Sequence, residues 1–427
     1  MGGLCGAALV ALAACGESEP DADRGAAGDP AYAVDLGARG ASFDRAGWRT
    51  DFAHRTVPLA EIYRGGPGRD DIPPLDRPGA VSRRLAAREL GQRDPVIAVA
   101  VGRAARAYPL RTLVWHEVVN DRLGGRPIAV TYSPLTDSSL VLDRRVEGRE
   151  LRLGTTGNLR RSNPLLWDRA TESWWQQMTG EATVGSLAGR RLRPMPVQTL
   201  SFAMFGRRFP RGDVLARPRG SRASYTRNPY LGYDRLQTAP HLFRGRVDGR
   251  LPPKERVVVL PGARPPVAVP FARLVRRRVA HLELGGTPAV VLYERGVASA
   301  IDADSVARSR DVGTAAAFDR RLDQQPLTFA RRDGAFVDRE TGSRWDVTGR
   351  AVAGPLRGRR LRRLRHEQAF WFAAAAFRPR LRVAAATGSH SIDRLGGTVA
   401  PAPRATPRAE ARRPPRRATR PGWEGGT

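Results

Sequence analysis

Cysteine is almost missing from this chain of 427 residues, because only Cys5 and Cys15 occur and both lie near the N-terminus. No disulfide framework can therefore hold the body of the protein together, and no cysteine zinc site or redox pair can form in it. If the chain is cleaved before Cys15 and that residue is lipidated, the mature protein has no free thiol. Its stability must then come from its core alone.

Lysine is scarcer still, since Lys254 is the single lysine among 72 basic residues. The basic residues outnumber the 42 acidic ones and give the chain a net charge of +30. Such an excess is typical of nucleic-acid binders, but those gather their charge on one stripe and interleave aromatic side chains. Here arginine is spread along the chain and is densest near the C-terminus, beside abundant Ala, Gly and Pro, which indicates a GC-rich coding bias. We therefore do not expect nucleic acid as a partner, whereas anionic lipid headgroups are at least as plausible.

Long hydrophobic runs are also missing. The apolar stretch from Leu4 to Cys15 is too short to span a bilayer, which needs about 20 residues. It ends in Leu12-Ala13-Ala14-Cys15, and small residues before a cysteine are typical of a bacterial lipoprotein signal, although the usual positive charges before the apolar stretch are absent. We expect residues 1–15 to be this signal, Cys15 to carry the lipid, and residues 16–45 to be a flexible tether. The protein is then exported and anchored to a membrane of the cell envelope.

What the chain does contain is self-similarity over a long period. Several blocks recur in the same order: Gly124-Gly125 and Tyr132 match Gly285-Gly286 and Tyr293, Asp168-Arg169 matches Asp338-Arg339, and Gly185-Ser186-Leu187-Ala188-Gly189 matches Gly354-Pro355-Leu356-Arg357-Gly358. The offset between the matching blocks grows only slightly along the chain. This pattern predicts an internal duplication with one net insertion.

Within each half the pattern favours strands. Apolar runs on both sides of Gly124-Gly125, of Gly285-Gly286 and of a turn at 340–342 predict hairpins. Short helical turns are expected at 109–113 and 270–275, and longer helices at 201–209 and 367–377. We therefore expect a mainly β fold, with a β-rich α+β fold as the second choice, made of two internally duplicated β-rich lobes with a few short helices.

The expected domain organisation follows from these patterns. The first β-rich repeat with its N-terminal extension covers residues 46–198, and the second covers residues 254–385. Between them lies a Tyr/Gly/Pro-rich connector at 199–253, which is long for a plain loop, and loops of that length are often functional. The Pro/Arg-rich tail at 386–427 lacks apolar periodicity, so we expect it to be disordered.

Several motifs carry a family resemblance, and they occur in order between Asp71 and Arg380: Ile72-Pro73-Pro74-Leu75-Asp76, Trp115-His116-Glu117-Val118-Val119-Asn120-Asp121, Asp168-Arg169-Ala170-Thr171-Glu172-Ser173-Trp174-Trp175 and Phe370-Trp371-Phe372-Ala373. In these motifs the chain resembles the bacterial family named domain of unknown function 3179. The resemblance implies an exported or lipoprotein-like protein without an agreed activity.

The chain departs from this family at one informative place. Where the family commonly has Tyr-Cys-Pro-Leu-Cys-Gly, this chain has Tyr132-Ser133-Pro134-Leu135-Thr136-Asp137. The family pattern, with a histidine upstream, implies a metal or thiol site. Hydroxyls are poor ligands for soft or borderline metals, so a cysteine-ligated metal is not expected here. The identity of any cofactor stays open, with His116 as a possible metal ligand.

A polar cluster is predicted at the two ends of the first hairpin. His116 lies just before it, and Ser133, Thr136 and Asp137 lie just after it, so the hairpin brings them near one another. A catalytic interpretation makes His116 the base, Asp137 its orienting partner and Ser133 a nucleophile. The alternative is a histidine bonded to a backbone carbonyl beside an ordinary Ser/Thr/Asp turn. The second half has none of these residues at the same offset.

Other residue groups have two interpretations each. Trp115, Tyr132, Trp167, Trp174, Tyr225 and Tyr230 are candidates for a ligand-binding groove, although core packing is the more common role of such side chains. Asp168-Arg169 and Asp338-Arg339 occur in both halves, which favours a structural role in which the aspartate caps a turn and the arginine pairs with it.

The sequence leaves open whether the protein is an enzyme. The first hypothesis is a lipid-anchored binding or accessory protein of the cell envelope with a degenerate metal or thiol site and an unidentified small-molecule or envelope ligand. The alternative is a hydrolase or transferase that acts on an envelope molecule through His116, Asp137 and Ser133.

Overall fold

The computed structural model describes residues 43, 45–219 and 223–385. The predicted lipoprotein signal with Cys15, nearly all of the predicted tether and the predicted disordered tail lie outside these residues. No helix within the described part of the chain is long and apolar enough to cross a membrane.

Strands dominate the fold, as predicted, and the first half of the chain forms three five-stranded sheets and one two-stranded ribbon. In spatial order, one sheet consists of β16 (Gln198–Ser201), β4 (Pro95–Val101), β5 (Ala104–Pro109), β17 (Asp213–Leu215) and β3 (Ala80–Ser82). Another consists of β15 (Pro194–Met195), β8 (Ser138–Asp143), β7 (Arg126–Ser133), β6 (Val118–Leu123) and β2 (Leu75–Asp76). The remaining one consists of β1 (Ile62–Arg64), β11 (Leu153–Arg160), β12 (Asn163–Asp168), β13 (Trp174–Gln176) and β14 (Glu181–Val184), and the ribbon pairs β9 (Arg145–Val146) with β10 (Arg149–Glu150).

The second half forms three four-stranded sheets and one ribbon. One sheet consists of β30 (Glu367–Phe370), β18 (Arg256–Leu260), β19 (Val267–Pro270) and β31 (Arg382–Val383). Another consists of β20 (Val279–Leu284), β21 (Thr287–Glu294), β22 (Thr314–Asp319) and β29 (Arg362–Arg363). The remaining one consists of β25 (Phe329–Arg332), β26 (Ala335–Asp338), β27 (Arg344–Trp345) and β28 (Ala351–Ala353), and the ribbon pairs β23 (Arg321–Leu322) with β24 (Gln325–Pro326).

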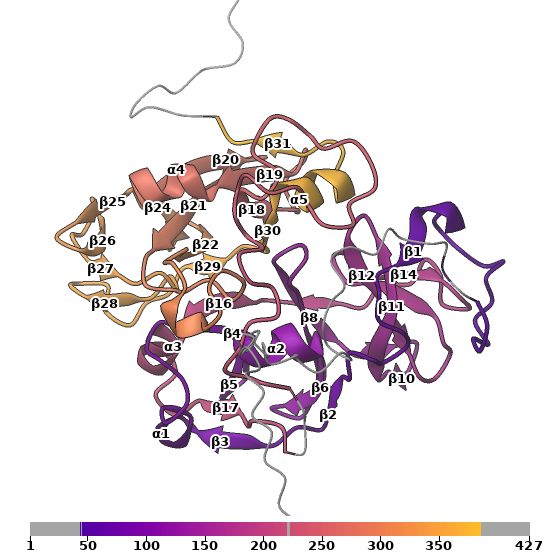
Figure 1. The fold of residues 1–427 in the computed structure, drawn as a ribbon. Helices are drawn as coiled ribbons and strands as arrows, with labels where there is room; N and C mark the ends of the chain where they lie inside the picture. Colours follow the sequence, from indigo (N-terminus) through magenta and orange to yellow (C-terminus); the bar gives the residue numbers. More distant parts are fainter. Residues whose placement is uncertain (1–42, 44, 220–222, 386–427) are drawn as a thin grey trace, which may run out of the picture. The chain divides into compact units, whose positions relative to one another are not determined.

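The order of pairing is the same in the two halves. The sheet β30-β18-β19-β31 follows the order of β16-β4-β5-β17, and the other sheets correspond in the same way. Figure 1 colours the first half indigo to magenta and the second half salmon to yellow. The three additional strands of the first half, β1, β2 and β3, precede residue 95, and each adds one edge strand to one sheet. The descent of both halves from one duplicated segment stays a prediction.

The described helices are short: α1 (Arg83–Ala86), α2 (Leu110–His116), α3 (Phe202–Arg208), α4 (Phe271–Arg277), α5 (Trp371–Phe377) and the 3-10 turns η1 (Leu59–Glu61) and η2 (Val306–Arg308). Helices α2 and α4 each follow a proline and end at a residue with positive φ, Glu117 at 54° and Arg278 at 64°. A left-handed residue stops a helix because it turns the chain away while its N–H still bonds a helical carbonyl. Here it directs the chain straight into β6 or β20.

One predicted helix is partly a strand. Residues 367–370 form β30, and only residues 371–377 are helical. Glu367 to Phe370 pair with the strand β18, so hydrogen bonds to a distant segment override the local helical pattern. The hairpins were predicted correctly, and at each Gly-Gly pair both glycines have the positive φ that a tight two-residue turn requires.

Two of the apolar clusters contain residues of both halves. One combines Ile97 and Val130 with Val257 and Phe370, and it includes the buried face of α5. A second combines strands β4 and β16 with β21, β22 and the hairpin β26–β27. Burial of apolar area is the main stabilising term in folding, so the two halves depend on each other for stability.

The two Asp-Arg blocks form the same turn. Asp168 accepts hydrogen bonds from the N–H of Thr171 and from the indole N–H of Trp175, at 2.7 and 3.0 Å. Asp338 accepts the equivalent bonds from Thr341 and Trp345, at 2.7 and 2.8 Å. The aspartate therefore caps a turn, but the predicted pairing with its own arginine is wrong for the first block. Arg169 instead forms an ion pair with Asp70, because that carboxylate lies beside β11 and β12.

We predict that Trp175→Phe and Trp345→Phe each lower the free energy of unfolding by about 2–3 kcal/mol, since each removes a donor to a buried carboxylate. Urea denaturation measures both. Trp371→Phe is the matched control, because its indole donates to the neutral carbonyl of Asp248 and its loss should cost less. Wild-type stability in either of the first two variants would contradict the prediction.

Candidate functional site

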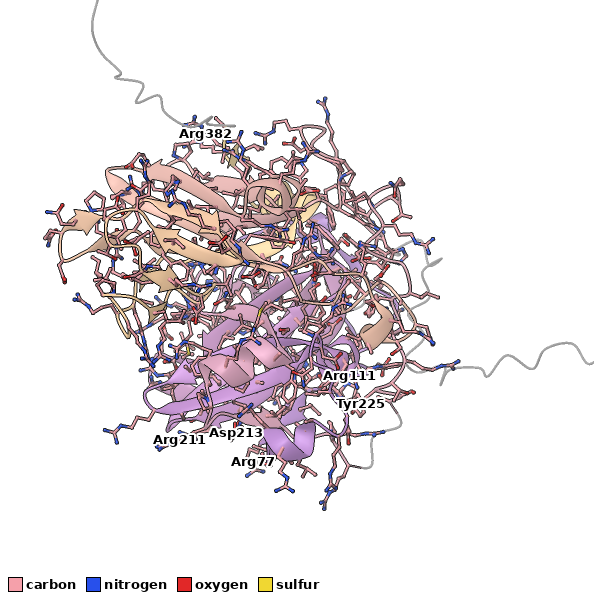
Figure 2. The ribbon with its side chains drawn as sticks, turned by 90° about the vertical axis from the view of Figure 1, so that its left-hand side faces the viewer. Arg77, Arg111, Arg211, Asp213, Tyr225 and Arg382 are labelled. Atoms are coloured by element: carbon pink, nitrogen blue, oxygen red, sulfur yellow. The ribbon has the colours of Figure 1, made fainter. Side chains whose placement is uncertain are left out.

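His116 lies at the end of α2 with both ring nitrogens engaged. Nδ1 is 2.7 Å from the carbonyl oxygen of Pro73, and Nε2 is 2.6 Å from the hydroxyl of Tyr225. Tyr225, labelled in Figure 2, also stacks on the imidazole with ring centroids 5.7 Å apart. A carbonyl only accepts, so Nδ1 carries the proton and Nε2 accepts from Tyr225. Burial lowers the pKa of His116, which keeps the ring neutral.

Glu117 follows His116 and is buried in an environment that opposes its charge. Burial raises the pKa of its carboxyl to about 8. Burial raises the pKa of the Tyr230 phenol, and the nearby charge of Glu117 raises it further. At neutral pH Glu117 is therefore largely a neutral carboxylic acid, which makes it an unusual group beside the predicted site.

Ser133 and Thr136 are the positions at which the family resemblance implies cysteines, and their hydroxyls have different surroundings. The Ser133 hydroxyl is buried at the end of β7 without a hydrogen-bond partner in the described structure. The Thr136 hydroxyl lies 2.8 Å from that of Ser138 and accepts from Asn163 at 3.0 Å. This network continues to Gln177, whose amide spans the Ser138 and Thr131 hydroxyls at 3.0 Å each.

Asp137 takes part in a buried ion network that links both halves and the connector. It accepts from the Tyr132 hydroxyl at 2.8 Å and pairs with Arg256 at 2.6 Å. The same guanidinium bonds Asp234 at 2.7 Å, and Asp234 also accepts from the Ser299 hydroxyl at 2.6 Å. Burial opposes the charge of Arg256, yet the two carboxylates outweigh burial and raise its pKa.

The three predicted catalytic residues therefore have separate partners. The recorded hydrogen bonds join His116 to Pro73 and Tyr225, and Asp137 to Tyr132 and Arg256, and none joins His116, Ser133 and Asp137 to one another. Within the described ranges no group of three His, Cys, Asp or Glu residues is arranged to hold a metal ion.

Most of the candidate groove aromatics are buried, and their role in a ligand groove stays a prediction. Five of the six are at most 5% exposed: Tyr132, Trp167, Trp174, Tyr225 and Tyr230. Trp115 is half-buried, and its indole donates to the carbonyl of Arg227. Trp174 packs edge-on against Trp48, Phe43 and Phe52 of the N-terminal extension. These rings contribute to packing at their present positions.

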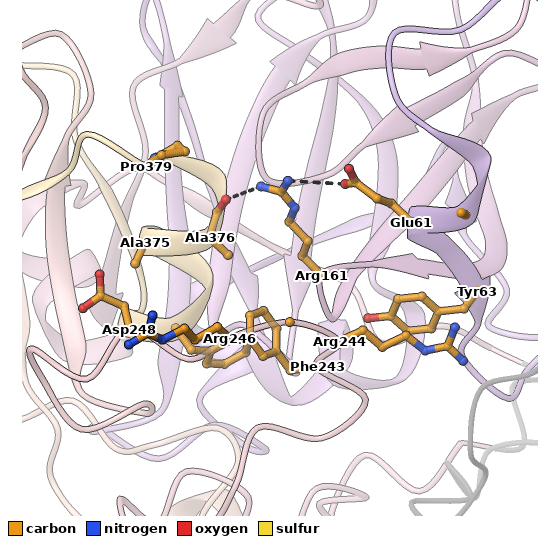
Figure 3. Close-up of a pocket in the computed structure, with 13 residues that line it drawn as sticks. Glu61, Tyr63, Arg161, Phe243, Arg244, Arg246, Asp248, Ala375, Ala376 and Pro379 are labelled. Carbon is orange, nitrogen blue, oxygen red and sulfur yellow. Dashed lines mark hydrogen bonds and ion pairs between the residues drawn. The ribbon is translucent and has the colours of Figure 1, made fainter.

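A cavity of about 520 Å³ lies elsewhere, between four segments that are far apart in the sequence (Figure 3). It is lined by Ala60, Glu61, Tyr63, Arg161, Phe243, Arg244, Gly245, Arg246, Asp248, Phe372, Ala375, Ala376 and Pro379. The lining comes from η1 and β1, from the turn between β11 and β12, from the connector, and from α5 with the residues after it. A volume of this size is typical of small-molecule sites.

The wall of this cavity is held by specific contacts. The Arg161 guanidinium donates to the carbonyl of Ala376 and pairs with Glu61 at 3.3 Å (Figure 3). The Tyr63 hydroxyl donates to the carbonyl of Leu242 at 2.5 Å, and the Arg244 guanidinium lies 4.2 Å from the centre of the Tyr63 ring. The connector is thus fixed against the first half.

The cavity carries an excess of positive charge. Its two carboxylates also pair with arginines outside the lining: Glu61, besides Arg161, with Arg160 at 2.7 Å, and Asp248 with Arg250 at 2.7 Å. Hydrogen bonds from Arg250 lower the pKa of Asp248 and keep it ionised. Among the described residues, no carboxylate forms an ion pair with Arg244 or Arg246, both of which are exposed. Their charges remain available to an anion.

Sequence reasoning did not single out these cavity residues, because they lie in segments whose proximity depends on the tertiary fold. One signal was present, since Phe243 to Asp248 belong to the connector, whose length indicated a possible functional role. The buried charges had a signal too: Lys254 and Glu255 directly precede β18, in which Arg256 is followed by four apolar residues. The carboxylate partners of Arg256 could not be predicted.

A family model described as "Protein of unknown function (DUF3179)" matches residues 69–381. The chain therefore belongs to this family, a group of proteins defined by sequence and without an assigned activity, as the resemblance indicated. No curated protein matches the chain, and no solved structure matches it.

We predict that stability falls as pH rises from about 4.5 to about 8, because of Glu117. In the unfolded chain its carboxyl ionises near the ordinary value of 4.5, whereas the folded protein holds the proton to about pH 8. Between these values the unfolded state binds fewer protons, so each pH unit lowers the free energy of unfolding by up to about 1.4 kcal/mol.

Urea denaturation from pH 5 to pH 8 compares the wild type with Glu117→Gln, which should lose this slope and gain relative stability as pH rises. Glu89→Gln is the control, because Glu89 is more than half exposed and solvent surrounds its carboxylate in both states. Parallel curves for Glu117→Gln and the wild type would show that Glu117 is ionised in the folded protein.

Proposed function

We propose that this protein is an exported, lipid-anchored protein of the bacterial cell envelope that binds a ligand rather than transforming one. The observation that carries the proposal is the cavity with Arg161, Arg244 and Arg246, whose positive charge exceeds that of its own carboxylates. A concave site with a few convergent polar groups is the usual form of a ligand site.

The chemistry of the lining favours an amphiphilic anion. The lining includes guanidiniums, which bind carboxylates, phosphates and sulfonates through paired N–H donors. It also includes apolar groups: Phe243, Phe372, Ala375 and Pro379. A molecule with an anionic end and an apolar body can contact both kinds of group, whereas a small inorganic anion leaves the apolar groups without contacts.

The loss of the family-type thiol or metal centre is part of the same proposal. The positions of the two cysteines hold hydroxyls, one without a partner and one inside a hydrogen-bond network. The alternative function, a hydrolase or transferase that uses His116, Asp137 and Ser133, gains no support from the contacts of these residues. A base needs a free nitrogen near its nucleophile, and both nitrogens of His116 are engaged.

We predict that the full chain in its native state binds the amphiphilic anion anilinonaphthalene sulfonate. Either Arg161→Gln or Arg244→Gln should weaken this binding about tenfold, because each removes one charge-assisted contact. Fluorescence titration measures the affinity. Arg359→Gln is the matched control, since Arg359 pairs with Asp323 at 2.6 Å away from the cavity.

The neutral probe N-phenyl-1-naphthylamine separates charge from apolar contact, because its affinity should be the same in all these proteins. The anion site is refuted if Arg161→Gln, Arg244→Gln and Arg359→Gln bind the sulfonate as tightly as the wild type.

The lipid anchor has its own test. When the full chain is produced in a bacterium that processes lipoproteins and is fed an alkyne-tagged fatty acid, the wild type should carry the label and Cys15→Ala should not. Cys5→Ala is the matched control and should be labelled like the wild type. Equal labelling of the Cys15→Ala variant would refute lipidation at this residue.

A further inference from the structure

A second cavity, of about 220 Å³, lies where the two halves meet. Strand β16 of the first half contacts β22 of the second half beside it. The cavity is lined by Ala98, Ala100, Pro196, Gln198, Leu200, Arg208, Phe209, Phe318, Thr348, Arg360, Leu361 and Arg363. It shares no lining residue with the cavity at Arg244.

Three arginines converge on this second cavity without a matching carboxylate. Arg208 is at the end of α3, Arg363 is in β29, and Arg360 lies between β28 and β29. Among the described residues, no carboxylate lies within 4.0 Å of these three guanidiniums. The Arg363 guanidinium donates to the neutral amide oxygen of Gln198 at 2.8 Å instead.

Aromatic rings hold two of these guanidiniums in place. The Arg208 guanidinium is 4.5 Å from the ring centre of Phe209, and that of Arg363 is 5.9 Å from the ring centre of Phe318. A guanidinium near a ring face gains a cation–π attraction without using its N–H donors. Within the described residues the one side-chain hydrogen bond of these three guanidiniums is that from Arg363 to Gln198, so their other N–H groups are available to a group placed in the cavity.

The charges of these arginines repel one another. Burial lowers the pKa of Arg363 to about 10, and the neighbouring charge of Arg208 lowers it further in the same direction. Burial and the charge of Arg360 likewise lower the pKa of Arg208. Asp346 reaches both guanidiniums only as a weaker, opposing charge, and its Oδ1 accepts from Thr348 and Arg350. Arg208 and Arg363 are half-buried and Arg360 is exposed, so a bound anion would offset the mutual repulsion of their charges.

We propose that this cavity binds a phosphate group through Arg208, Arg360 and Arg363. Guanidiniums present paired N–H donors that match the oxygens of phosphate, and three of them can surround a tetrahedral anion. The small volume suits the phosphate group itself. The group can be free inorganic phosphate or the terminal phosphate of a larger molecule whose remainder stays outside the cavity.

Isothermal titration of the full chain with inorganic phosphate tests this site. The wild type should bind phosphate saturably, and Arg208→Gln or Arg363→Gln should weaken the affinity at least tenfold. Arg359→Gln removes the same charge next to Arg360 in the sequence but outside the cavity, so its affinity should stay within twofold of the wild type. Titration with glycerol 3-phosphate separates the sources: tighter binding than inorganic phosphate indicates a phosphate carried by a larger molecule.

Thermal unfolding separates a binding role from a structural one. Without phosphate, Arg363→Gln should unfold at the same temperature as the wild type or higher, because it removes a repulsive charge. Phosphate should raise the unfolding temperature of the wild type but not of Arg363→Gln. The proposal is overturned if the wild type does not bind phosphate saturably, or if Arg359→Gln loses as much affinity as the cavity variants. Either result leaves the sulfonate cavity at Arg244 untouched.

Discussion

The ion pairs of Arg256 are the contact on which the rest of the structure depends. This residue begins the strand β18 in the second half, and its guanidinium joins Asp137 of the first half to Asp234 of the connector. Without this cation the half-buried Asp137 would lose its ion pair with Arg256 and the buried Asp234 would keep only its ion pair with Arg310, which is destabilising, so the three segments are tied to one arrangement. The apolar cluster that combines Ile97 with Val257 and Phe370 lies across the same junction, so polar and apolar contacts specify the same docking of the halves.

This constraint explains why the predicted catalytic cluster and the ligand cavity are in different places. Asp137 bonds Tyr132 and Arg256, and His116 bonds Pro73 and Tyr225, so these groups join segments of the fold. The cationic cavities are lined instead by arginines whose carboxylate partners are missing or already paired. In a chain with a single lysine, the planar guanidinium is available both for stacking on aromatic rings and for binding anions.

The local elements were largely predictable, and the long-range ones were not. The Gly-Gly hairpins and the aspartate-capped turns depend on positive φ values and on hydrogen bonds within a few residues, which the sequence displays directly. The helical pattern at 367–377 was misleading because β30 pairs with β18, more than a hundred residues away. Arg169 pairs with Asp70 for a similar reason, since the N-terminal extension places Asp70 beside the strands β11 and β12. Neither partner leaves a trace in local periodicity.

The sequence by itself determined the strand-rich class, the hairpin turns, the membership of the family and the absence of cysteines from the positions where the family commonly has them. These features follow from backbone preferences and from residue identity, which act at short range. The tertiary structure alone decided which polar groups are buried in pairs and which remain open to a ligand, because pairing depends on distances between segments far apart in the chain. Lys254 shows the difference: its rarity is visible in the sequence, but only the fold buries its amine against the carbonyl of Tyr233 and lowers its pKa to about 8 through burial.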